Sequence, residues 1–106
     1  GYDEKNFIVA DFIRKESFKL LQQLGSDEIF MVERNYAYNV DSIVQRMIHR
    51  QDLSFKKKVT LMKKYCGKEY IEAVNRYYSG MYGKLLRSKI FVLVVAYLQI
   101  LNRKKK

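Results

Sequence analysis

The chain of 106 residues contains no proline, the residue that interrupts helices most strongly. Its residues are 48% hydrophobic and 30% charged, which is too apolar for a disordered chain and suits a globular domain. Apolar residues recur at helical spacing along most of the sequence. We therefore predict a mainly all-α fold, with four to five helices in a small bundle that forms one domain.

The first half of the chain predicts two helices and one ambiguous stretch. Spacing close to 3.6 residues over 6–24 predicts a helix, and Gly25 can close it in a left-handed cap. Residues 28–32 fit a short strand as well as a helix, because their apolar residues are consecutive and also helically spaced. Asp41 or Ser42 can cap the helix that follows.

The second half predicts further helices. Ser54 is a helix cap, and Gly67 ends the helix that it begins. Another helix is expected over residues 68–78, and a last segment begins near Tyr82. Residues 80–83 (GMYG) have the G-x-x-G form with which KH domains clamp nucleic acid, but those domains need a sheet. A turn between helices is the interpretation that we prefer.

Basic residues are concentrated in the second half of the chain. Residues 1–53 carry 7 basic and 9 acidic residues, whereas residues 54–106 carry 14 and 2, and the net charge of the chain is +10. Such asymmetry favours a surface for phosphates or anionic lipids. The candidate anion-binding residues, for a membrane or another partner, are Lys56, Lys57, Lys58, Lys63, Lys64, Lys84, Arg87, Lys89, Arg103, Lys104, Lys105 and Lys106.

An almost purely apolar run, residues 90–101, lies between these cations. Twelve helical residues span roughly 18 Å, which is shorter than the hydrocarbon core of about 30 Å, so the run is not a normal transmembrane helix. A helix that is apolar on all sides is either buried in a bundle or sunk into a membrane interface, and both alternatives remain open. The candidate residues for insertion or packing are Phe91, Leu93, Tyr97 and Leu98.

The partner of the basic half is not decided by composition. Its tyrosines can stack on nucleic-acid bases or lie among lipid headgroups. An anionic membrane, a nucleic acid and a second copy of the chain, packed through residues 90–101, are therefore the three expected partners.

The sequence offers few groups for chemistry. His49 is the single histidine, so we expect no metal site and no cofactor in this chain. Cys66 is the single cysteine, lies on an apolar helix stripe and cannot form an internal disulfide, which favours the cytoplasm. Glu69 and Glu72 lie among basic residues, so ion pairing at the surface is expected of them.

Three stretches resemble the end of family-2 glycosyltransferases, the GT-A type bacterial enzymes of surface polysaccharide synthesis. Residues 2–12 (YDEKNFIVADF) resemble a segment that reads roughly F-D-E-N and then E-D-x-x-F. FMV at 30–32, YAY at 36–38 and SI at 42–43 are similar to later elements. Residues 83–106, beginning GKLLRSKIF, are similar to the basic apolar helix with which many of these enzymes end.

The resemblance implies that Asp11 is the catalytic base that takes a proton from the acceptor hydroxyl. The expected Glu before it is Ala10, and the nucleotide-sugar-binding half with its D-x-D motif is absent. Together with the leading Gly1, this implies a C-terminal piece of a longer enzyme, inactive when isolated. That piece would contribute anchoring and acceptor-side packing as a cytoplasmic region, peripheral on the inner face of the membrane.

Overall fold

The structure, a computed structural model, describes residues 2–104, and these form six α-helices without a strand. The helices are α1 (Lys5–Gln23), α2 (Ile29–His49), α3 (Phe55–Tyr65), α4 (Lys68–Tyr77), α5 (Met81–Ser88) and α6 (Phe91–Lys104). The all-helical prediction is confirmed. The number of helices was predicted slightly too low, and the alternative of a strand at residues 28–32 is wrong.

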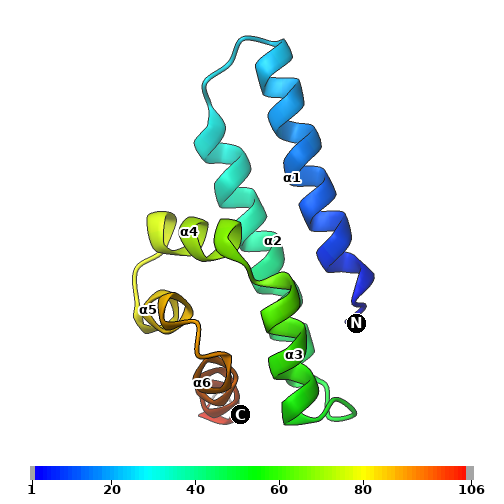
Figure 1. Cartoon of the computed structure of the whole chain (residues 1–106), viewed down its shortest axis with the longest axis vertical. Helices are drawn as coiled ribbons and strands as arrows, with labels where there is room; N and C mark the ends of the chain where they lie inside the picture. The colour runs from blue at the N-terminus through cyan, green and yellow to red at the C-terminus, as the bar shows by residue number, and fades with distance from the viewer. Residues whose placement is uncertain (1, 105–106) are drawn as a thin grey trace.

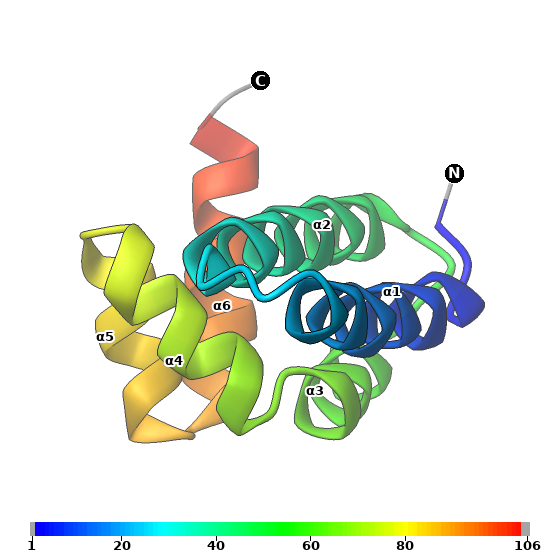
Figure 2. The same ribbon diagram turned by 90° about the horizontal axis from the view of Figure 1, so that it is seen from above.

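Helix α2 is the centre of the molecule. It runs antiparallel to α1 as one half of a long helical hairpin (Figure 1), and it also contacts α3, α4 and α6. Seen from above (Figure 2), α4 and α5 lie to the left of this hairpin, α6 crosses α2, and α3 lies below α1 in the view. The contacts of α6 with α2, α3 and α5 close the bundle.

The ambiguous stretch near residue 30 is the first turn of α2, which continues unbroken to His49. Asp41 and Ser42 therefore lie inside a helix instead of capping one. The helically spaced residues Tyr36, Val40 and Met47 are all buried. These residues can all face the core only if they belong to one continuous helix. Packing of that helix therefore outweighs the strand propensity of residues 28–32.

The additional helix arises from a break at Lys89. This residue has a left-handed backbone with φ of 58°, which is uncommon outside glycine. The Ser88 side chain stabilises the break, because its Oγ donates to the Leu85 carbonyl (2.6 Å) and accepts from the Ile90 amide (3.2 Å). The final segment is therefore two helices, α5 and α6, with different directions (Figure 1).

Two predicted caps are present. Gly25 has φ of 67° and its amide donates to the Gln22 carbonyl, while the Ser26 amide donates to the Leu21 carbonyl at 2.9 Å, as in a Schellman motif. The Ser54 hydroxyl accepts the Lys57 amide at 3.1 Å and caps α3.

The core is built mainly by α2, α3, α4 and α6. Met47, Met62 and Tyr70 are fully buried, each contributing about 1.5–3 kcal/mol of apolar burial. Helix α1 adds only Phe7 and Ala10 to the buried set. Several of its apolar side chains are exposed and, with Leu24 at the C-cap, form what we call the α1 apolar face: Ile8, Val9, Phe12, Ile13, Leu20 and Leu24.

Candidate functional site

Helix α6 is apolar over most of its length, and the bundle covers only one side of it. Phe91, Val94, Val95 and Leu98 are buried against the core. Leu93 (48% exposed) and Ile100 (53% exposed) lie seven residues apart, which is two helical turns, and so share the opposite side. With Val92 and with Ile90, the residue directly before α6, which are also half exposed, they form the α6 outer face.

Cations border the α6 outer face at both ends. Arg87 and Lys89 precede it, and Arg103 and Lys104 follow it in the last turn of α6, all of them exposed. Lys105 and Lys106 lie outside the described residues. An exposed apolar stripe between basic residues is the arrangement found in helices that lie in a membrane interface.

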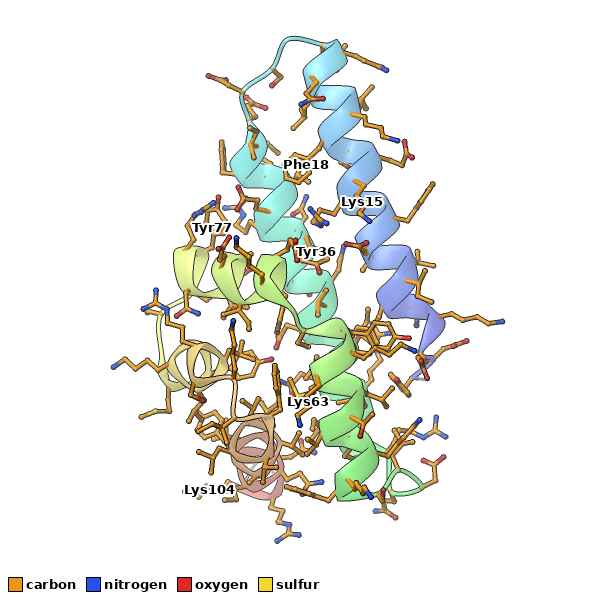
Figure 3. The ribbon with its side chains drawn as sticks, in the orientation of Figure 1. Lys15, Phe18, Tyr36, Lys63, Tyr77 and Lys104 are labelled. Carbon is orange, nitrogen blue, oxygen red and sulfur yellow. The ribbon has the colours of Figure 1, made fainter. Side chains whose placement is uncertain are left out.

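A second group of cations covers α3. Lys56, Lys57, Lys63 and Lys64 are exposed on its solvent side, and Lys84 is exposed on α5. Figure 3 labels Lys63 on α3 and Lys104 at the end of α6, in the same half of the molecule. Lys64 is partly neutralised, because its Nζ lies 3.3 Å from a Glu4 carboxylate oxygen.

Lys58 does not belong to this basic face. It is 5% exposed, and its ammonium donates a 2.9 Å hydrogen bond to the Ile48 carbonyl near the end of α2. Burial lowers the pKa of Lys58, although the nearby Asp52 carboxylate opposes that effect. The hydrophobic stem and the bonded ammonium make Lys58 part of the core, so it is left out of the anion-binding set.

The other packing candidates of the last helix divide between core and surface. Phe91 and Leu98 are buried, Leu93 is exposed, and Tyr97 is partly buried against the core. Leu93 alone among the four therefore presents a largely exposed apolar side chain to solvent.

Asp11 forms part of an ion-pair cluster on α1. One carboxylate oxygen lies 2.9 Å from Arg14 Nη2 and the other lies 3.1 Å from Lys15 Nζ. Partial burial alone would raise the pKa of Asp11, but the hydrogen bonds from Arg14 and Lys15 outweigh burial and lower it. A carboxylate held this way is a weak proton acceptor.

Arg14 connects Asp11 to two aromatic rings. Its guanidinium carbon lies 5.2 Å from the ring centre of Tyr36 and 5.9 Å from that of Phe18. Figure 3 shows Phe18 and Tyr36 between α1 and α2. A cavity of about 500 Å³ opens beside these residues, and Asp11 is not among the residues that line it. The cluster therefore holds α1 against α2. Asp11 takes part in it as the ion-pair partner of Arg14 and Lys15.

The remaining titratable candidates are not assembled into a site. Cys66 is fully buried, and burial raises the pKa of its thiol. Exposed His49 has its Nδ1 3.1 Å from Asn102 Nδ2. Glu69 and Glu72 are exposed on α4. Within residues 2–104, no three or more His, Cys, Asp or Glu side chains are grouped to hold a metal ion.

Sequence reasoning missed a pocket of about 200 Å³ between α2, α4 and α5. Four of the nine tyrosines line it together with one carboxylate, Asp41. These residues are far apart in the sequence. The abundance of tyrosine was visible, but its convergence depends on how the three helices pack.

Comparison of the chain with protein-family models, with curated proteins and with solved structures finds no match in any of the three. Across residues 2–104, none of the helices combines the length and the apolar character needed to cross a bilayer.

Proposed function

We propose that this chain is a helical region that attaches peripherally to an anionic membrane surface through the α6 outer face. The observation that carries the proposal is the half exposure of Leu93 and Ile100 on a helix whose other side is buried. Exposed cations at both ends of the same stripe support it, because they can pair with lipid phosphates while the apolar residues enter the interface.

The expected attachment is reversible. Lys89, Arg103 and Lys104 each contribute about 1 kcal/mol near an anionic surface, and burying an exposed leucine or isoleucine adds up to about 1.5–3 kcal/mol. The exposed halves of Leu93 and Ile100 supply part of that amount. Binding of this strength weakens as salt screens the charges.

The resemblance to family-2 glycosyltransferases extends the proposal. We propose that the chain is the C-terminal region of a nucleotide-sugar-dependent glycosyltransferase of surface polysaccharide synthesis, cytoplasmic and peripheral on the inner face of the membrane. The α1 apolar face supports a packing role, because Ile8, Val9 and Phe12 lie in the stretch that carries the resemblance and are exposed. The salt-bridged environment of Asp11 supports packing rather than chemistry.

Sedimentation with liposomes tests the attachment. The wild-type chain is expected to sediment with vesicles containing anionic lipid at low salt and to be released at high salt. The double variant Leu93→Asn/Ile100→Asn is expected to lose most of this binding. Phe12→Asn/Ile13→Asn is the matched control, because it changes two equally exposed apolar residues on α1. Equal loss in both variants, or no sedimentation of the wild type, would exclude the α6 outer face.

The lysine face of α3 favours a second candidate, binding to nucleic acid. Lys56 and Lys63 lie two turns apart with Lys57 and Lys64 beside them, which can follow a phosphate backbone. A gel shift at low salt tests this function, with Lys56→Glu/Lys63→Glu as the variant. A shift that is abolished in that variant but kept in Leu93→Asn/Ile100→Asn would favour nucleic acid, whereas no shift excludes it.

A further inference from the structure

The tyrosine pocket between α2, α4 and α5 has a wall made of buried, rigid groups. Tyr70 is fully buried on α4, and its hydroxyl lies 2.8 Å from the hydroxyl of Tyr82 on α5. The two rings meet edge to face, with centres 6.4 Å apart. Because these rings are held by the core and by each other, the pocket is preformed.

The rim of the pocket is also aromatic. Tyr38 on α2 is 66% exposed, and Tyr78, which follows α4, is 44% exposed. A ligand entering from solvent therefore meets Tyr38 and Tyr78 at the mouth and the partly buried Tyr82 behind them. The electron-rich faces of aromatic rings attract cations, and this attraction strengthens when water is excluded.

The lining of the pocket includes an acidic residue, although the chain as a whole is basic. The chain has 21 Lys and Arg residues, but none of them is among the described residues that line the pocket. Asp41 is among those lining residues. Burial is the main cause of the raised pKa of Tyr70 and of Tyr82, and the negative charge of Asp41 contributes to both. Both hydroxyls therefore stay neutral at physiological pH, close to one carboxylate.

Size restricts what can bind. A volume of about 200 Å³ lies below the usual range of about 300–1,000 Å³ for drug-sized ligands, so it suits a single small group. A bare ammonium ion needs several hydrogen-bond acceptors, whereas a methylated ammonium needs only apolar aromatic walls and negative charge.

We propose that the pocket formed by Tyr38, Asp41, Tyr70, Tyr78 and Tyr82 binds a methylated ammonium group. Such a group occurs on free quaternary amines and on the phosphocholine headgroups of lipids. Its charge lies near the Asp41 carboxylate, and its methyl groups contact the rings of Tyr38, Tyr78 and Tyr82. The site is separate from the α6 outer face, because α6 contributes no lining residue.

The experiment compares choline with dimethylbutanol, its neutral analogue, in which carbon replaces the charged nitrogen. Ligand-observed NMR on the full chain is expected to detect saturable binding of choline and roughly tenfold weaker binding of the neutral analogue. Vesicles with phosphocholine headgroups and no anionic lipid distinguish the two sources. Competition between these vesicles and choline indicates a lipid headgroup, and its absence indicates a free amine.

Variants locate the binding. Asp41→Asn is expected to weaken choline binding about tenfold, since it removes the charge from a partly desolvated site. Asp52→Asn is the matched control, because it removes the same charge from an exposed residue that pairs with Arg50 and does not line the pocket. Tyr78→Leu, on the rim, is expected to weaken binding about two- to fivefold while the fold is kept.

Equal affinity for choline and the neutral analogue, or no saturable binding in the millimolar range, would overturn the proposal. An unchanged affinity in both Asp41→Asn and Tyr78→Leu would overturn it as well. None of these results depends on anionic vesicles, so failure here is distinguishable from failure of membrane attachment through α6.

Discussion

Lys58 donates the hydrogen bond of 2.9 Å that ties α3 to the Ile48 carbonyl of α2. It is one of three consecutive lysines, yet it alone of the three is buried. The contact satisfies a carbonyl in the last turn of α2, where main-chain acceptors lack partners within the helix.

Replacing Lys58 should therefore destabilise the fold. We expect Lys58→Ala to lower the free energy of unfolding by about 1–3 kcal/mol, because a buried acceptor loses its donor and the packing of the stem is lost. Lys58→Met keeps most of the stem and should lose less. Urea unfolding followed by circular dichroism measures the effect. Lys56→Ala on the exposed side of α3 is the control, with a change within about 0.5 kcal/mol.

Gly83, inside α5, leaves room for the Asn75 side chain of α4. A Cβ at this position would lie 2.9 Å from Oδ1 of Asn75, whose side-chain nitrogen donates to the carbonyls of Ile71 and Gly83. We expect Gly83→Ala to cost about 1 kcal/mol, because the bonds lost when the Asn75 side chain shifts outweigh the gain in helix propensity from alanine. Thermal unfolding measures it. An unchanged melting temperature would contradict this explanation.

Tyr36 should make the protein sensitive to alkali. Burial, helped by the charge of Asp11, raises the pKa of Tyr36 to about 12. The unfolded chain releases the Tyr36 proton near pH 10. The stability that Tyr36 contributes is therefore fully present below about pH 10 and is lost as pH rises toward about 12. By about pH 11 the loss is about 1 kcal/mol for this residue.

Urea unfolding of Tyr36→Phe against pH measures that contribution. The variant should lose less stability between neutral and alkaline pH than the wild type. Tyr38→Phe, at an exposed tyrosine two residues away, should follow the wild-type curve. A Tyr36→Phe curve parallel to that of the wild type would show that the tyrosine does not titrate as described.

Lys89 adopts a left-handed conformation that glycine would adopt without strain. We expect Lys89→Gly to raise the free energy of unfolding by up to about 1 kcal/mol. Lys84→Gly, inside α5, should lower it by about 1 kcal/mol because glycine disfavours a helix interior. The two melting temperatures should therefore move in opposite directions, and a decrease in both would mean that Lys89 is not strained.

The helical class, the Gly25 cap and the Ser54 cap were all predictable, because each depends on neighbouring residues. The continuity of α2 was not, since a short apolar run satisfies strand and helix patterns equally until its partners are known. The burial of Lys58 was equally hidden, because nothing near it in the sequence identifies Ile48 as its acceptor. The candidate site could be predicted only in part. The apolar run of α6 is visible in the sequence, but which side of the helix is exposed depends on its packing against α2, α3 and α5.

The attachment of α1 has a consequence for local stability. This helix contacts chiefly α2, and only Phe7 and Ala10, near its beginning, are buried. Amide hydrogen exchange should therefore vary along the α1–α2 hairpin, slow beside Phe7 and fast toward Gly25, because opening the far end breaks few buried contacts. The far end of the hairpin, around Gly25, can come apart while the core around Met47 stays folded, so that end should unfold as a separate, less stable unit.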